Sequence, residues 1–258
     1  MTFHKQAGIT LVDLLLSMLL GIVVLSGVIS IYVAVVKSSS DTLKSSKLNT
    51  QLMTIMSVMS NDIRRAGYWN DFISEPQTNP FSQLDDTALE VINSPASNTG
   101  YADNTDVNGE CIVYAYDENE NGVVDADSEY FGFRLLDGVV QMRASGTVTD
   151  GDNCNNGVWM DLSDSDLYTI TRLTFNPKNS ACVDSSEPNG IDDDGANGID
   201  DAGEADCYSL VPAVGSGEIT VETRDIEVSL AGVLKSDNSV SMQITQSVRI
   251  RNDLIRVR

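Results

Sequence analysis

The stretch LLLSMLLGIVVLSGVISIYVAVV, residues 14–36, decides the fold, because 23 consecutive residues carry no charged side chain. A helix of that length spans the ~30 Å hydrocarbon core of a bilayer. The stretch lies near the N-terminus of a 258-residue chain, which leaves enough sequence for one globular domain but not for two large ones. The sequence therefore predicts one membrane-spanning helix followed by a single domain.

The helix is expected to continue beyond the apolar stretch. Apolar side chains recur there at helical spacing, at Leu48, Leu52, Ile55, Met59 and Ile63. Gly67 is a natural stop, and Arg64 and Arg65 occupy the expected last turn, where cations favour the helix dipole. A continuous helix from Ile9 to Ala66 is ~87 Å long. We expect its second half to pack on the domain, with the methionines of this stripe as core filler: Met53, Met56 and Met59.

A short basic segment precedes the apolar stretch. It contains His4 and Lys5, ends at Gly8, and is followed by Ile9 and Asp13. A secretory signal peptide is cut after its apolar core, whereas the expected cut here lies before it. An acid at the membrane edge is costly and usually indicates a partner. An ordinary signal anchor is the alternative interpretation of this segment.

These features resemble the prepilin leader of type IV pilins and type II secretion pseudopilins. In that family a prepilin peptidase cuts after a glycine and methylates the new amine, so the resemblance implies cleavage after Gly8 and methylation of Ile9. Asp13 matches the acid at the fifth mature position, which supplies a counter-charge for a buried N-terminal ammonium. The family usually has phenylalanine where Ile9 stands and glutamate where Asp13 stands.

The segment DIRRAGYW, residues 62–69, resembles the helix end of PilW-type minor pilins. The resemblance covers Thr2 to about Asn70, and more loosely the C-terminal strands. It implies a minor pilin that helps to prime pilus assembly and sits at or near the tip. The expected partners are the prepilin peptidase, the inner membrane before assembly, and other major and minor pilins through the N-terminal helix. The expected location is the inner membrane, with the domain in the periplasm, and then the extracellular fibre. A J-type type II secretion pseudopilin and a calcium-dependent surface adhesin are the alternatives.

The rest of the chain reads as short strands separated by turns. The candidates are Leu89–Ile92, Cys111–Tyr116, Tyr130–Leu136 and Val139–Met142 around an Asp137-Gly138 turn, Tyr168–Phe175, Ile219–Val221, Ile226–Leu230, Val240–Ile244 and Val248–Ile250. One long helix with such strands predicts an α+β fold, an antiparallel sheet packed on the helix. The expected organisation is a leader at 1–8, a membrane or filament-core helix at 9–37, its amphipathic second half at 38–67, and the domain at 68–258.

The composition excludes several classes of function. Lys and Arg total 16 against 38 Asp and Glu, for a net charge of −22, and such a chain has no basic surface for nucleic acid. The only histidine, His4, lies in the leader, which excludes histidine triads and histidine metal sites from the mature chain. The acids lie in polar, glycine-rich loops, where nothing is expected to raise a carboxyl pKa. We therefore expect no enzymatic activity.

The four cysteines, Cys111, Cys154, Cys182 and Cys207, fall within the acidic stretch between Tyr101 and Cys207. An even count behind an export-type N-terminus suits two disulfides in an oxidising compartment. Three pairings are open. We favour Cys111–Cys154 with Cys182–Cys207, because each bond then closes one acidic loop without crossing the other. Reduced cysteines in a cytosolic domain are the alternative.

Two acidic segments have the composition of calcium loops. The first places oxygen ligands at alternate residues, with Gly122 at the sharp turn: Asp117, Asn119, Asn121, Asp125, Asp127 and Glu129. Ser128 stands at the twelfth position, so either the loop bulges to bring in Glu129 or Asp127 substitutes. A second, weaker set is counted from Asp193: Asp193, Asn197, Asp201 and Glu204. Calcium is therefore a possible cofactor, and solvated turns are the alternative for both segments.

Overall fold

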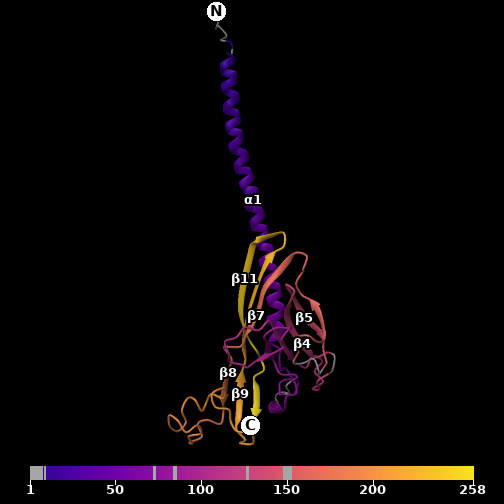
Figure 1. Cartoon of the computed structure of the whole chain (residues 1–258), viewed down its shortest axis with the longest axis vertical. Coiled ribbons are helices and arrows are strands. Elements are labelled where there is room, and N and C mark those ends of the chain that lie inside the picture. The colour runs from indigo at the N-terminus through magenta and orange to yellow at the C-terminus, as the bar shows by residue number, and fades with distance from the viewer. Residues whose placement is uncertain (1–7, 9, 72–73, 84–85, 126–127, 148–152) are drawn as a thin grey trace, which may run out of the picture. The chain divides into compact units, whose positions relative to one another are not determined.

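The computed structural model describes residues 8, 10–71, 74–83, 86–125, 128–147 and 153–258. The chain divides into two compact units, an N-terminal unit, Met1–Lys47, and a globular unit, Leu48–Arg258. One helix, α1 (Leu11–Ile63), belongs to both (Figure 1). At 1.5 Å per residue its 53 residues extend ~80 Å. In the N-terminal unit, residues 10–43 are all exposed, and the apolar part of α1 is long enough to cross a membrane.

The strands of the globular unit form three antiparallel sheets, where the sequence predicted one sheet. The six-stranded sheet has the order β2-β1-β3-β4-β5-β6, and the two smaller sheets have the orders β11-β10-β7 and β12-β9-β8. The strands are β1 (Glu90–Ile92), β2 (Gly100–Tyr101), β3 (Cys111–Ala115), β4 (Tyr130–Leu136), β5 (Val139–Ser145), β6 (Val158–Asp161), β7 (Tyr168–Asn176), β8 (Ala181–Asp184), β9 (Ile219–Thr223), β10 (Asp225–Leu234), β11 (Asp237–Arg249) and β12 (Leu254–Val257). A short 3-10 helix, η1 (Pro76–Thr78), lies between α1 and β1. The α+β class is confirmed.

The hairpin between β4 and β5 forms at the predicted dipeptide. Asp137 and Gly138 have φ of 50° and 78°, which is the pair of positive values that a type I′ turn requires. Leu136 then pairs with Val139 across the turn. The turn residues therefore set the register of the centre of the six-stranded sheet.

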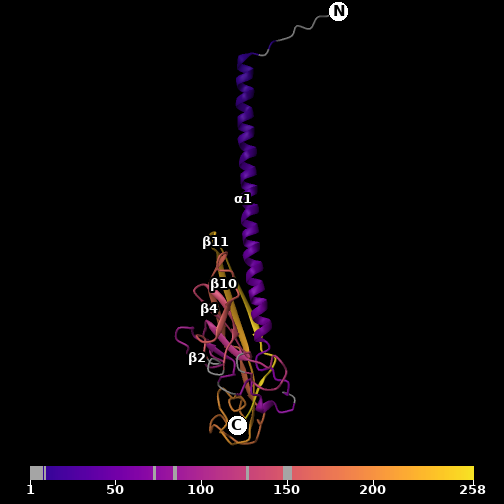
Figure 2. The same cartoon turned by 90° about the vertical axis from the view of Figure 1, so that its right-hand side faces the viewer.

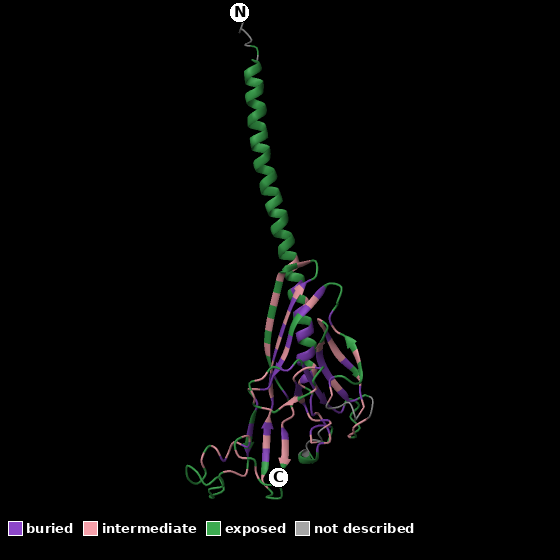
Figure 3. Ribbon diagram, viewed as in Figure 1, coloured by how far each residue is buried: buried purple, intermediate pink, exposed green. Residues whose placement is uncertain are grey.

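The core of the globular unit is built around the end of α1. The predicted stripe is buried, and Met56 and Ser60 are buried with it. Side chains from the sheets cover this face, among them Ile112 on β3, Phe133 on β4 and Leu230 on β10. Figure 2 shows these strands gathered against the C-terminal part of α1, and Figure 3 shows that this part and the inner strands carry the buried residues. The helix is thus a core element of the globular unit.

Two details of the helix differ from the sequence prediction. Met53 was expected in the core, but it is 56% exposed, because it lies off the stripe. The helix ends at Ile63 and not at Ala66, so Arg64 and Arg65 lie beyond its last turn. Hydrogen bonds from Arg65 N to Asp62 O and from Ala66 N to Ile63 O tighten the chain into turns. Gly67, with φ of 69°, then redirects it, and its N–H donates to Ala115 O of β3 at 2.8 Å.

Candidate functional site

The N-terminal residues singled out from the sequence lie at the start of α1. Gly8 is exposed, with open space around its Cα, and Ile9 lies outside the described residues. Thr10 precedes the helix, and its hydroxyl accepts from Asp13 N at 3.3 Å and donates to the Asp13 carboxylate at 2.7 Å. Thr10 N donates to the same carboxylate at 3.2 Å. Thr10 and Asp13 therefore form a capping box, a local role for Asp13 that the sequence analysis did not anticipate.

The other end of α1 is fixed to β3 by one carboxylate. Asp62 accepts a hydrogen bond from the Tyr114 hydroxyl at 2.6 Å and another from the Tyr116 hydroxyl at 2.9 Å. Arg65 lies 3.7 Å from the same carboxylate and 4.0 Å over the Tyr116 ring, which also stacks on Phe131 at 3.8 Å. We call Asp62, Tyr114 and Tyr116 the helix clamp. Burial, and then the Asp62 charge, raise the pKa of Tyr114 and of Tyr116, so both hydroxyls remain donors at physiological pH.

Replacing Asp62 by alanine is expected to lower the free energy of unfolding by about 3 kcal/mol, because two tyrosine hydroxyls lose their acceptor and that of Tyr114 is fully buried. Urea unfolding of the chain from Ser38 onward measures the change. Combining Asp62→Ala with Tyr114→Phe should cost less than the sum of the two single changes. Asn61→Ala, on the exposed side of the same turn, should have little effect. Additive losses would contradict the clamp.

The residues after the helix connect it to the first acidic loop. The Trp69 indole N–H donates to Gly122 O at 3.0 Å. Asn70 N donates to the Asp117 carboxylate at 3.2 Å, and its side-chain amide donates to Glu120 O at 3.3 Å. Tyr68 O accepts from Asp117 N at 2.9 Å. The segment 62–70, singled out from the sequence for a resemblance, thus contacts both β3 and the first acidic loop.

The first acidic loop closes on two fully buried carboxylates, Asp117 and Glu129. Asp117 accepts from the N–H groups of Asn121 and Gly122, both at 3.0 Å. Glu129 accepts from Glu118 N at 2.9 Å and from Asp125 N at 2.8 Å. In the described part of the chain, neither carboxylate pairs with a lysine or arginine. Among the described residues, the groups that compensate their charges are backbone N–H dipoles.

The remaining expected ligands of this loop lie together. The side-chain amides of Asn119 and Asn121 both donate to the Asp125 carboxylate, at 2.6 and 2.8 Å. Gly122, with φ of 79°, makes the sharp turn. Asp127 lies outside the described residues. Glu129 reaches back into the loop through its contacts with Glu118 N and Asp125 N.

The second acidic loop is organised in the same way around Glu204, which is 2% exposed. Its carboxylate accepts from Asp193 N at 2.5 Å and from Asp201 N at 3.0 Å. In each loop the buried glutamate therefore accepts from the N–H eleven residues earlier, that of Glu118 or of Asp193. This shared contact aligns the two loops.

The alignment gives the second loop a different register from the expected one. Asp192, Asp194, Asp200 and Glu204 each lie 75 residues after their counterparts Asp117, Asn119, Asp125 and Glu129. The structure brings carboxylate oxygens of Asp192, Asp194 and Glu204 within 4.8 Å of one another, and those of Glu187, Asp200 and Glu204 likewise. The expected set began at Asp193 instead. Of that set, Asp193 has a carboxylate oxygen within 4.8 Å of those of Glu187 and Glu218. The Asp201 carboxylate accepts from Gly203 N. Asn197 lies in the exposed tip of the loop and has a positive φ.

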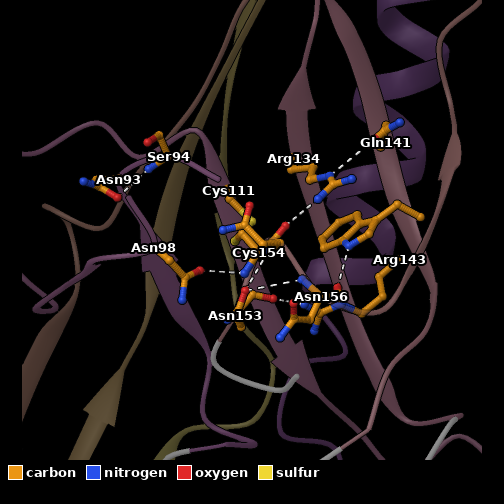
Figure 4. The surroundings of a disulfide bond; sticks show 12 residues. Asn93, Ser94, Asn98, Cys111, Arg134, Gln141, Arg143, Asn153, Cys154 and Asn156 are labelled. Atoms are coloured by element: carbon orange, nitrogen blue, oxygen red, sulfur yellow. Dashed lines mark hydrogen bonds between the residues drawn. A yellow bond between two sulfur atoms is a disulfide. The ribbon is translucent and has the colours of Figure 1, made fainter. Parts of the chain in front are cut away.

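Both disulfides have the favoured pairing, Cys111–Cys154 and Cys182–Cys207. Figure 4 shows the first, which joins β3 to the segment before β6. Cys154 N donates to the Asn98 side chain at 2.7 Å, and Cys154 O accepts from Arg134 at 2.6 Å. Arg134 is held in turn by Gln141 at 2.8 Å. The bond thus lies inside a hydrogen-bonded network that includes β1-to-β2 and β4 residues.

Buried charged groups are the main feature that sequence reasoning missed. Arg134 and Arg143 lie over the Trp159 ring, 4.3 and 4.8 Å from its centroid, and Arg143 also donates to Asn153 O. Apolar periodicity does not predict that such residues are buried, because a long cationic side chain in a strand is expected to face solvent. The aromatic ring and the nearby carbonyls are the groups that stabilise them in the interior.

A second buried network contradicts the expectation that no carboxyl pKa is raised. Glu222 on β9 is 4% exposed, accepts from the Tyr208 hydroxyl at 2.7 Å, and lies 3.4 Å from Arg256. Burial, together with a hydrogen bond to Glu222, raises the pKa of Asp103 to about 8. Arg224, 2% exposed, and Arg256 are the nearby positive charges. These groups join the segment after β2 to β9 and β12 through a shared polar interior.

One comparison with known proteins identifies a family, and it is a prepilin peptidase-dependent one. The family model described as PpdB, prepilin peptidase-dependent protein B, matches residues 41–250, which is most of the chain. An uncharacterized protein of Haemophilus influenzae is 25% identical over 164 residues. That alignment covers 50% of this chain and 66% of the relative, just under two thirds of the relative's length. No solved structure matches.

Proposed function

The chain belongs to the prepilin peptidase-dependent protein B family, and from this membership we propose that it is a minor pilin of a type IV pilus, helping to prime assembly at or near the tip. The family description implies processing by prepilin peptidase, and the membership makes the protein pilin-like or pseudopilin-like. The observation that carries the finer proposal is α1, a single helix that is apolar and exposed at its start and forms the domain core at its end. Such a helix can pack against other helices while it presents a folded domain.

The proposal includes a PilW-type identity, with cleavage after Gly8 and methylation of Ile9. The single apolar helix is compatible with membrane anchoring. We place the protein in the bacterial inner membrane first, with the globular unit in the periplasm, and then in the extracellular fibre. Its partners are other major and minor pilins, contacted through α1. Two disulfides support folding in an oxidising compartment.

A J-type type II secretion pseudopilin uses the same scaffold and is the second candidate. Identifying the proteins that copurify with the full chain from membranes separates the two, since the partners belong either to a pilus or to a secretion system. We propose no enzymatic role. The buried carboxylates are engaged by backbone N–H groups in the acidic loops, and by Tyr208 and Arg256 around Glu222. These contacts support a structural role for the acids.

Asp13→Ala is expected to leave membrane insertion intact and to abolish or strongly reduce pilus assembly, because an N-terminal ammonium between helices loses its counter-charge. Piliation and membrane fractionation measure the two effects. The capping box with Thr10 makes a sharper comparison available. Asp13→Asn keeps an oxygen that accepts from Thr10 but removes the charge, whereas Asp13→Glu keeps the charge. Assembly by the asparagine variant and failure of the glutamate variant would assign Asp13 to capping alone.

We also propose that the two acidic loops bind calcium. In the described part of the first loop, backbone N–H dipoles are the groups that offset the negative charge of the two buried carboxylates, Asp117 and Glu129. The neighbouring oxygens are carboxylate and amide oxygens, which are hard donors that suit calcium. The same spacing in the second loop supports a second site at Asp192, Asp194, Asp200 and Glu204, with the same chemistry.

Calcium at a hundredfold excess over its Kd is expected to stabilise the chain from Ser38 onward by ~2.7 kcal/mol per site, which corresponds to a rise in Tm of roughly 5–10 °C. Thermal unfolding in millimolar calcium and in chelator measures it. Asp117→Ala with Asp125→Ala should remove the contribution of the first loop, whereas Asp166→Ala, an exposed acid outside both loops, should not. Magnesium should do less, because it holds its water and requires a tighter octahedron. If the Tm does not change with calcium at low ionic strength, both loops are solvated turns.

A further inference from the structure

A basic pocket lies where the turn after α1 meets β10 and the end of β11. It has a volume of about 470 Å³, and we call it the arginine pocket; its lining residues are Arg64, Asp225, Ser247, Arg249, Ile250 and Arg251. Two backbone hydrogen bonds fix these segments, from Arg251 N to Arg64 O at 3.1 Å and from Ile250 N to Arg224 O at 2.9 Å. The three guanidinium groups therefore project from a rigid junction and not from a mobile loop.

The charge of the arginine pocket is not neutralised from within. Asp225 is its one carboxylate, and it accepts from the Ser247 hydroxyl. Arg249 is 65% exposed and lies 3.9 Å from Asp253, a contact too long and too exposed to contribute much. Across the described ranges, Arg64 and Arg251 form no ion pair. The arginine pocket therefore carries more positive than negative side chains. Such a surface is exceptional on a chain with a net charge of −22.

The same globular unit carries a surface of the opposite sign. Between residues 184 and 206 there is no lysine or arginine, and residues 191–200 are all exposed. The acids of this segment are Asp184, Glu187, Asp192, Asp193, Asp194, Asp200, Asp201, Glu204 and Asp206. The segment lies between β8 and β9 (Figure 1), on elements that do not line the arginine pocket. The two charged surfaces are therefore separate places on one molecule.

We propose that the arginine pocket receives the acidic segment, residues 184–206, of a second copy of this chain, through the exposed residues 191–200. Guanidinium groups bind carboxylates through two parallel hydrogen bonds, which gives such a contact direction as well as attraction. Each copy offers one basic and one acidic surface, so the contact is head-to-tail and leaves both outer surfaces free. This inference goes beyond the proposed function, because it assigns a contact between copies that any fibre-forming or membrane-bound subunit can make.

The test uses two full-length copies with different tags, expressed together in membranes. One copy carries a photoreactive amino acid at Ser247 in the arginine pocket. We expect a cross-linked product containing both tags, with the link mapped by mass spectrometry to residues 184–206 of the other copy. Arg249→Glu with Arg251→Glu in the first copy should reduce this product about tenfold, as expected when charges in a contact are reversed. Arg172→Glu, an exposed reversal on β7, is the matched control and should not reduce it.

A charge swap then decides the proposal. Adding Asp193→Lys, at an exposed acid that is not among the proposed calcium ligands, to the second copy should restore the product with the reversed pocket and lower it with the natural one. Links to a different segment of the second copy, to another protein or to lipid alone would overturn the proposal. Failure of the swap to restore the product, while both variants reach the membrane in normal amounts, would overturn it as well.

Discussion

A chain with Gly8→Val is expected to keep its first eight residues and to be absent from assembled fibres. The family description implies processing by prepilin peptidase, and Gly8 matches the residue before the cut. Among the described residues, no atom lies within 4 Å of a Cβ added at Gly8, so valine there meets no steric clash with them. Any loss therefore reflects the fit of the segment to the peptidase. Intact mass spectrometry of the membrane-extracted chain measures the outcome directly.

The control for this experiment is Gly21→Val. Gly21 also has open space around it, but it lies inside α1, beyond the expected cut. That variant should lose residues 1–8 and begin at a methylated Ile9, as the unmodified chain should. A mature N-terminus beyond Val36, in any of the three chains, would contradict the pilin interpretation and favour an ordinary signal peptide.

Replacing Cys111 and Cys154 together by serine is expected to lower the free energy of unfolding by about 4 kcal/mol, because the bond closes a loop with a separation of 43 residues. That is a large share of the 5–15 kcal/mol that stabilises a typical domain. Loss of the bond also frees Cys154, whose backbone anchors Asn98 and Arg134. Urea unfolding of the chain from Ser38 onward measures the change.

The second disulfide offers a matched comparison. Cys182 and Cys207 are separated by 25 residues, so their joint replacement should cost about 3.5 kcal/mol by the same loop-closure argument. The first bond also lies in an apolar cluster with Ile92 and Val113, which should widen the difference. A larger loss from the second pair would show that loop closure and packing around Cys111 do not govern stability here.

Strong periodicity made several elements predictable. The helical stripe from Leu48 to Ile63 is buried as expected, and the segments at Cys111 and Tyr130 form neighbouring strands. The cysteine pairing followed from the order of four residues along the chain. In these cases the local pattern is compatible with one favourable arrangement of the element, because an apolar stripe must face a core.

The short strands left weaker signals. β6 has one half-buried and three exposed residues, so no alternation marks it. β8 does alternate, but its buried positions are Cys182 and Asp184, and an aspartate reads as solvent-facing. Periodicity also identifies a strand without identifying its partner, which is why one predicted sheet became three.

The candidate site was predictable in composition but not in contacts. The oxygen-bearing residues of both acidic loops can be read from the sequence, whereas the alignment of the two loops depends on which N–H donates to the buried Glu204. The role of Asp62 was not predictable either. Its partners, Tyr114 and Tyr116, are more than fifty residues away, and no local pattern carries a contact at that separation.

The continuity of α1 has a mechanical consequence. A pulling force on its N-terminal end enters the globular unit along the helix axis, through the buried residues from Leu48 to Ile63 and the Asp62 contacts to β3. A force in that direction acts on all of these packed side chains at once. Their contacts must therefore break together and not one after another. Both disulfides join residues beyond this entry point. Resistance to tension therefore rests on packing and on one carboxylate, while the covalent bonds protect only the parts downstream.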